Sequence, residues 1–277
     1  MKVTARPEPE IENAYRRFLD DDFATMEMME VRRVLFDRLV AGEIDIEAVE
    51  KKWPDTEKPE RSDQFYAGAL SLLKGTGRLT TEEDILSLLL VMEMYEKGHP
   101  DWGKTGYFIS AMVNLAMEAK KESDRRIVLP LGELGKYLEG LCYWLQAGTV
   151  ICDSDAGSYF AGSQLGGKAF LKGRSSYGTC RRKHAGLTRM KSAGDFLNIL
   201  ANGGLTIVDE ETGENAGEEM TDGEVYAGRF GGGSNCIRGG KFFQYYGRPW
   251  WNLFRETYSQ VWPYKEGDKP VFKTLPV

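Results

Sequence analysis

The sequence predicts an α+β protein, in which a bundle of α-helices precedes a parallel β-helix, or solenoid, of about six rungs. We use "rung" for one circuit of the solenoid. Apolar residues recur at steps of three and four through the first 146 residues, as in helices. From Gly148 onward, strand-like runs that open with a glycine recur about every 19 residues. Charge and glycine content also change near Ala147.

Composition sets the broad class of protein. The chain has 277 residues, of which 42% are hydrophobic and 12% aromatic, enough for one or two domains. Four cysteines without a CxxC pair indicate no disulfide framework, and no apolar stretch approaches a membrane span. The first ten residues, MKVTARPEPE, contain no apolar signal region, so a cytoplasmic location is expected.

The charge shift divides the chain. Residues 1–146 carry 28 acidic and 20 basic side chains, whereas residues 147–277 carry 14 and 16. We therefore expect a helical domain over 1–146, a solenoid over 147–247, and an aromatic tail over 248–277 that packs back on the body.

The helical part contains segments with the apolar period of an α-helix. They are residues 10–19, 25–42, 61–75, 81–98, 106–122 and 131–148, with a shorter helix expected at 45–53. Thr80 and Thr81 ahead of Glu83 and Asp84 indicate a capped helix start. Glycines are expected to end three of the helices: Gly75, Gly98 and Gly148. No HExxH, ExxH or paired-carboxylate motif indicates a metal site here.

The second part repeats a glycine followed by a short strand. The runs are GTVIC, GKAFL, GLTRM, GLTIV, GEVYA and GKFFQ, which start at 148, 167, 186, 204, 223 and 240, with spacings of 19, 19, 18, 19 and 17. This period is too short for two helices, so stacked strands are expected. Glycine allows positive φ or close backbone approach at the corners. The glycines expected in such structural positions are Gly148, Gly157, Gly162, Gly167, Gly178, Gly204, Gly213, Gly217, Gly223 and Gly240.

Columns of equivalent residues indicate which side chains face inward. The second and fourth positions after each opening glycine are mostly small or apolar and are expected to face the core, so Cys152 is interpreted as core filler. The fifth and seventh positions carry both charge signs and are expected at the surface. The third position should face outward, yet five of its six residues are large and apolar or aromatic. We call this column the apolar row: Ile151, Phe170, Arg189, Ile207, Tyr226 and Phe243.

An exposed apolar row of this kind usually marks an interface. We expect the helical domain, through residues 137–146, or the aromatic tail, which contains Trp250, Trp251 and Trp262, to cover it. If neither segment does, a partner-docking surface becomes the better interpretation.

The repeat resembles a known family. The segments DAGSYFAGSQLGGKAFLKG (155–173) and ENAGEEMTDGEVYAG (214–228) are similar to the GxGxG-repeat domain that ends the large subunit of glutamate synthase. A similar domain forms one of the subunits of formylmethanofuran dehydrogenase. The resemblance covers about residues 147–247 and implies a right-handed parallel β-helix that packs between catalytic domains or subunits. It implies no catalytic residue and no cofactor. The third rung, with Arg189 at an apolar position, departs most from the pattern.

Other functions that use glycine-rich or repeated sequences agree less well with this sequence. A dinucleotide site needs a helix between its glycines and the next strand. A carbohydrate-cleaving β-helix needs two carboxylates about 5–9.5 Å apart. Asp153 and Asp209 share a column, but three rungs separate them by about 14–15 Å. The six-residue period of hexapeptide acyltransferases is not seen.

One basic segment, residues 174–191, is the candidate binding site. It has six Lys or Arg residues and no acidic residue. We expect it to bind an anion or an acidic partner, or alternatively to form a solvated loop between rungs. Cys180 and His184 lie four residues apart, but two ligands do not make a zinc site. The candidate residues are Arg174, Arg181, Arg182, Lys183, His184, Arg189 and Lys191.

The sequence therefore favours a non-catalytic structural or subunit-contact module. The alternative is an enzyme or small-anion-binding protein with a pocket between the helical domain and the solenoid. A protein partner or a second copy of the chain is the expected partner. No membrane contact is expected, and the net charge of −6 disfavours nucleic acid.

Overall fold

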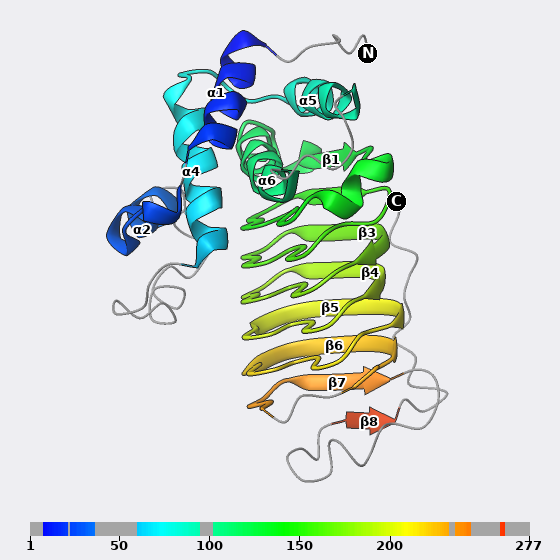
Figure 1. Cartoon of the computed structure of the whole chain (residues 1–277). Coiled ribbons are helices and arrows are strands. Elements are labelled where there is room, and N and C mark those ends of the chain that lie inside the picture. The colour runs from blue at the N-terminus through cyan, green and yellow to red at the C-terminus, as the bar shows by residue number, and fades with distance from the viewer. Residues whose placement is uncertain are drawn as a thin grey trace.

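The chain folds as α-helices followed by an all-parallel β-solenoid of about six rungs (Figure 1). The structure is a computed structural model that describes residues 8–21, 23–36, 60–94, 102–232, 236–244 and 261–263. The predicted fold class is confirmed.

The described helices match the predicted segments up to residue 122. They are α1 (Pro9–Asp20), α2 (Met28–Phe36), α4 (Arg61–Gly75), α5 (Glu82–Met94) and α6 (Trp102–Glu118), with the short 3-10 helices η1 (Phe23–Thr25) and η2 (Glu122–Asp124). The helix expected at 45–53 lies outside the described residues. In Figure 1, α1, α5 and α6 lie beyond the first rung, while α2 and α4 lie beside the edge at which the strands begin.

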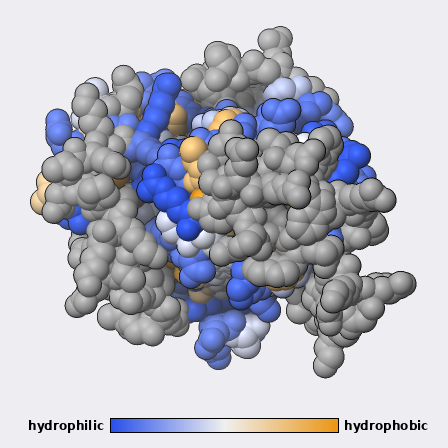
Figure 2. Space-filling view, turned by 90° about the horizontal axis from the view of Figure 1, so that it is seen from below, coloured by the Kyte–Doolittle hydropathy of each residue, from blue (hydrophilic) through white to orange (hydrophobic). Residues whose placement is uncertain are grey.

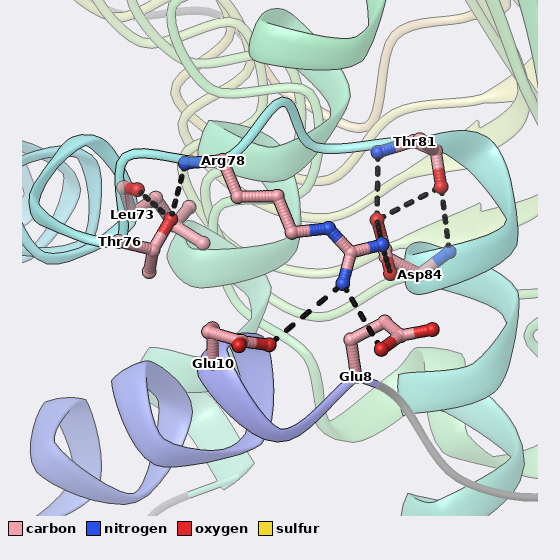
Figure 3. A network of polar contacts seen from close by, with 7 residues as sticks. All are labelled: Glu8, Glu10, Leu73, Thr76, Arg78, Thr81 and Asp84. Carbon is pink, nitrogen blue, oxygen red and sulfur yellow. Dashed lines mark hydrogen bonds and ion pairs between the residues drawn. The ribbon is translucent and has the colours of Figure 1, made fainter.

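The start of α5 has the predicted cap. The Thr81 hydroxyl accepts a hydrogen bond from the Asp84 backbone N–H at 3.2 Å, and the Asp84 carboxylate accepts one from the Thr81 N–H at 2.9 Å. Arg78 also donates to Asp84 at 3.1 Å and forms an ion pair with Glu8, the residue that precedes α1 (Figure 3). This network ties α1 to the connection between α4 and α5.

The solenoid contains eight strands in sequence order, each parallel to its neighbours. They are β1 (Arg126–Leu129), β2 (Thr149–Cys152), β3 (Lys168–Ser175), β4 (Leu187–Ala193), β5 (Asn202–Glu211), β6 (Asp222–Arg229), β7 (Lys241–Gln244) and β8 (Val261–Pro263). The six predicted runs form β2 to β7. The register shifts by one residue between β3 and β4, from the pair Leu171–Met190 to the pair Arg174–Ser192, so the rung that starts with β4 is one residue shorter.

The predicted inward columns are buried. The second-position residues pair from strand to strand and are at most 2% exposed: Val150, Ala169, Thr188, Thr206, Val225 and Phe242. The fourth-position column is buried as well, and it includes Cys152. The core therefore follows the period-two alternation of the strands.

The helix predicted over 131–148 is wrong. These residues instead form the 3-10 helix η3 (Gly132–Tyr137) and a series of turns that complete a rung between β1 and β2. Arg126 pairs with Thr149 and Leu129 with Cys152, so the parallel sheet already begins at β1. Residues 126–146 thus add a rung that the glycine period does not reveal.

In the wall opposite the strands, the backbone φ angle alternates between positive and negative values. At every second residue φ is near +60°, including non-glycine positions such as Tyr159, Ala161 and Ser163. Their N–H groups bond alternately to the next and the previous rung: Tyr159 to Tyr177 O at 2.8 Å, and Ala161 to Leu141 O at 2.8 Å. The wall is therefore hydrogen-bonded from rung to rung in the way that the sheet is.

The predicted structural glycines occupy two kinds of position. Seven have positive φ: Gly148, Gly167, Gly178, Gly204, Gly217, Gly223 and Gly240. At Gly167 a Cβ atom would also lie 2.8 Å from the carbonyl carbon of Ala147 in the preceding rung. The other three meet neighbouring atoms too closely for a side chain: Gly157, Gly162 and Gly213.

The apolar row runs in register along the outer face of the sheet. It continues through Val128 in β1, which is 41% exposed, and through the backbone of Trp262 in β8, which pairs with Phe243. Ile151 and Ile207 are buried, whereas Phe170, Tyr226 and Phe243 are half-buried. The described helices lie beyond the first rung and beside the strand starts in Figure 1, so they do not lie over this face. The aromatic tail, which was the second expected cover, lies outside the described residues except for the backbone of Val261–Pro263. Figure 2, a view from the β8 end, shows a mostly hydrophilic described surface with small apolar areas.

Candidate functional site

The seven candidate residues of the basic segment do not converge on one site. Arg181 and Arg182 contact the start of α4, and Lys183 lies inside the solenoid. Arg189 and Lys191 lie on the sheet face, where Arg189 pairs with Asp209 at 3.0 Å and Lys191 with Glu210 at 3.7 Å. The two remaining candidates, Arg174 and His184, lie elsewhere: Arg174 lines a hollow at a corner of the solenoid, and His184 is half-buried.

Arg181 binds Glu60 through two parallel hydrogen bonds. Its Nη2 lies 2.7 Å from Oε1 and its Nε 3.0 Å from Oε2. Burial raises the pKa of the Glu60 carboxyl, but the hydrogen bond from Arg181 and the charge of Arg182 outweigh it and hold this pKa below its ordinary value. The bidentate geometry fixes the orientation of both groups.

Arg182 binds Asp63 in a more buried setting. Its Nη1 lies 2.6 Å from Asp63 Oδ2, and the Asp63 side chain is 1% exposed. The other carboxylate oxygen accepts hydrogen bonds from the Tyr143 hydroxyl at 2.8 Å and from Trp144 Nε1 at 3.3 Å. Burial lowers the pKa of Arg182, but the charges of Asp63 and Glu60 reverse this and raise it. Burial also raises the pKa of the Tyr143 hydroxyl.

Local structure places the two carboxylates. Glu60 is the N-cap residue of α4 and Asp63 lies in its first turn, where the helix dipole favours negative charge. Asp63 lies on the buried face of α4 together with Tyr66, Leu70 and Leu73. A carboxylate at helical spacing within an apolar face is the signal from which this contact could have been found.

The acidic surface that faces the basic segment therefore belongs to the same chain. Glu60, Asp63, Arg181 and Arg182 clamp α4 to the solenoid, and Tyr143 and Trp144 close the contact from the first rung. We call these six residues the interdomain clamp. Each positive charge in it is paired with a carboxylate, so loss of one member would leave an unpaired charge in a partly buried contact.

Lys183 is a fully buried lysine in the core of the solenoid. Its Nζ donates to Leu205 O at 2.6 Å and to the Thr188 hydroxyl at 2.9 Å, and Thr206 Oγ1 lies at 3.4 Å. Thr188 in turn donates to Gln164 Oε1 at 2.6 Å. Burial lowers the pKa of Lys183 to about 8. The side chain does not reach the surface at which an anion would bind.

A hollow of about 420 Å³ lies at one corner of the solenoid. We call it the corner hollow. It is lined by Lys136, Asp155, Ala156, Arg174, Ser175, Ser176, Tyr177, Gly194 and Asp195. It lies on the rungs themselves, and none of its lining residues belongs to the interdomain clamp. The prediction of a pocket between the helices and the solenoid did not anticipate it.

The cysteines and carboxylates do not assemble a metal site within the described part of the chain. Cys142, Cys152 and Cys180 are buried in the solenoid core, and a hydrogen bond with Cys152, together with burial, raises the pKa of Cys142. His184 and Cys180 form no such group.

Comparison of the chain with known proteins finds no matching family, no similar characterised protein and no similar solved structure. Within the ranges that the structure describes, none of the helices has the length and apolar character needed to cross a membrane.

Proposed function

We propose that this chain is a non-catalytic scaffold whose solenoid contacts a partner subunit through the apolar row. We also propose that the solenoid is of the GxGxG-repeat type that ends the large subunit of glutamate synthase. The glycine period and the glycine positions at the corners support this relation. We base the proposed subunit contact on the apolar row.

The row has the properties of a docking face. Its members are held by strands in continuous register, and Tyr226 stacks on Phe243 with ring centroids 4.4 Å apart. Charged residues of both signs flank it on the same strands, among them Lys168, Lys172 and Asp209. Half-buried aromatic rings with charged residues beside them match the anatomy of protein interfaces. The occupant that we propose is the apolar face of a different subunit.

The interdomain clamp supports a structural role for the rest of the molecule. Arg181 and Arg182 are already bonded to carboxylates of the same chain, which favours a scaffold over the alternative of an anion pocket between the domains.

The test is isolation of the chain from its native host under non-denaturing conditions, followed by native mass spectrometry. We expect a stoichiometric complex with a second protein that is lost in the double variant Phe170→Ser/Tyr226→Ser. The variant Lys121→Ser, at an exposed lysine just before η2 and outside the row and its charged rim, should retain it. Isolation of the wild-type chain as a monomer, as a homo-oligomer, or in a complex that survives the double substitution would contradict the proposal.

A further inference from the structure

We infer that the corner hollow is a binding site for a neutral saccharide. This site is separate from the apolar row and from the interdomain clamp. The inference rests on the chemistry of the lining, on the rings beside it and on the way its carboxylates are held.

The lining combines donors and acceptors with no net charge. Lys136 and Arg174 supply positive charge, and Lys136 is also paired with Glu133 at 2.8 Å. Asp155 and Asp195 supply negative charge, and Ser176 adds a hydroxyl. All five side chains are exposed. Two carboxylates would repel phosphate or sulfate, and the two cations would repel an ammonium group. A ligand with many hydroxyl groups uses both kinds of partner, because each hydroxyl donates and accepts.

The two carboxylates are fixed before a ligand arrives. Asp155 Oδ1 accepts the backbone N–H of Arg174 at 2.7 Å, and Asp195 Oδ1 accepts that of Glu214 at 2.8 Å. Each aspartate thus binds the rung that follows it through one oxygen, while its side chain remains exposed. Fixed acceptors reduce the entropy that is lost on binding.

An aromatic ladder runs beside the hollow on three successive rungs. The Tyr159 and Tyr177 ring centroids are 5.8 Å apart with the rings edge to face, and those of Tyr177 and Phe196 are 5.0 Å apart with the rings tilted by 48°. Tyr177, which lines the hollow, is 39% exposed. A Cβ atom at Gly178 would lie 2.8 Å from the Tyr159 ring, so a residue without a side chain is needed here to leave room for the ring. A sugar ring has an apolar C–H face and a rim of hydroxyls, which suits an aromatic face beside charged groups.

The repeat of the ladder favours an oligosaccharide over a monosaccharide. Rungs stack at about 4.8 Å, so the rings and the polar groups recur along the solenoid axis. A chain of sugar units laid along this axis would stack on the exposed ring of Tyr177 and pass the half-buried rings of Tyr159 and Phe196 on the neighbouring rungs.

The experiment is isothermal titration calorimetry of the full chain with cellohexaose, xylohexaose, mannohexaose and chitohexaose, and with hexagalacturonate and inorganic phosphate as anionic probes. We expect at least one neutral hexasaccharide to bind in the millimolar range or tighter and the two anionic probes not to bind. Tyr177→Ala and Asp195→Asn should each weaken binding by about tenfold or more. Tyr177→Phe should retain it, because the ring remains.

The matched control is Asp209→Asn, which makes the same change at an exposed aspartate of β5 outside the hollow and should leave binding unchanged. Far-ultraviolet circular dichroism verifies that each variant is folded. Three results would overturn the inference: no neutral probe binds, an anionic probe binds at the hollow in place of a neutral one, or binding is unaffected by Tyr177→Ala and Asp195→Asn.

Discussion

Arg182 Nη1 lies 2.6 Å from Asp63 Oδ2, and the two side chains are 14% and 1% exposed. One belongs to the turns of the solenoid that precede β4 and the other to the first turn of α4. A buried charge that loses its partner is costly, whereas removal of both charges often costs little. Loss of one member of this pair should therefore weaken the contact between α4 and the solenoid more than loss of both.

We predict that Asp63→Asn destabilises the protein by about 3–5 kcal/mol, because the Arg182 charge stays buried without its carboxylate. The double variant Asp63→Asn/Arg182→Met should lose clearly less than the sum of the two single losses. Urea unfolding of the four proteins measures the coupling.

The exposed pair Arg238–Glu219, at 3.2 Å, is the control for this cycle. Its side chains are 66% and 40% exposed, so Glu219→Gln should cost less than about 1 kcal/mol. Equal losses for Asp63→Asn and Glu219→Gln would show that the clamp is not a buried ion pair.

A second prediction concerns the corners of the rungs. Gly167 has φ +62° and is packed against the preceding rung, whereas Gly77 has φ +67° and has no atom within 4 Å of its hypothetical Cβ. Gly77→Val should cost the backbone strain alone, about 1–3 kcal/mol. Gly167→Val should cost more than this, because the side chain also displaces the backbone of residues 147 and 148.

Thermal unfolding followed by circular dichroism compares the two valine variants. Equal losses would mean that close rung contact at Gly167 does not contribute to stability.

The third prediction concerns pH. The pKa of Lys183 is lowered from 10.5 to about 8 in the folded protein, so the unfolded chain binds more protons between these values. The contribution of Lys183 to the free energy of unfolding therefore becomes more favourable as the pH rises across this window. Below pH 8 Lys183 is charged in the folded protein, and burial of this charge lowers the free energy of unfolding. By about pH 10.5 the group is neutral, so the free energy of unfolding is higher by up to about 3 kcal/mol.

The variant Lys183→Met isolates this effect, since tyrosines and cysteines that titrate nearby are common to both proteins. We expect the unfolding free energy of the wild type to rise relative to that of Lys183→Met between pH 8 and pH 10. Parallel pH profiles for the two proteins would contradict the lowered pKa.

The sequence was sufficient to predict the six glycine-opened strands, because a solenoid repeats one local rule at a fixed spacing. The same rule failed at the first rung. Arg125, and not a glycine, precedes β1, and the rung that follows is buried on both sides: Leu141 and Leu145 are in the core, and Tyr143 and Trp144 contact Asp63 of α4. Because this rung is buried on both sides, its apolar residues recur at the three- and four-residue steps that are also typical of a helix.

The candidate site was harder to predict for a different reason. Neighbouring positive charges are placed in different surroundings: Arg182 faces α4, whereas Lys183 faces the core. Every second residue of this wall has positive φ, including Cys180 and Arg182, and L-residues rarely adopt that conformation. Composition alone does not reveal such a backbone.

The scaffold proposal is tested most directly by hydroxyl-radical footprinting of the native complex and of the isolated chain, read by mass spectrometry. Phe170, Tyr226 and Phe243 should be oxidised in the isolated chain and protected in the complex. Tyr137, which is 37% exposed and lies outside the apolar row, should be oxidised equally in both. Equal oxidation of the three row residues in the complex and in the isolated chain would contradict the claim that the apolar row is the subunit contact.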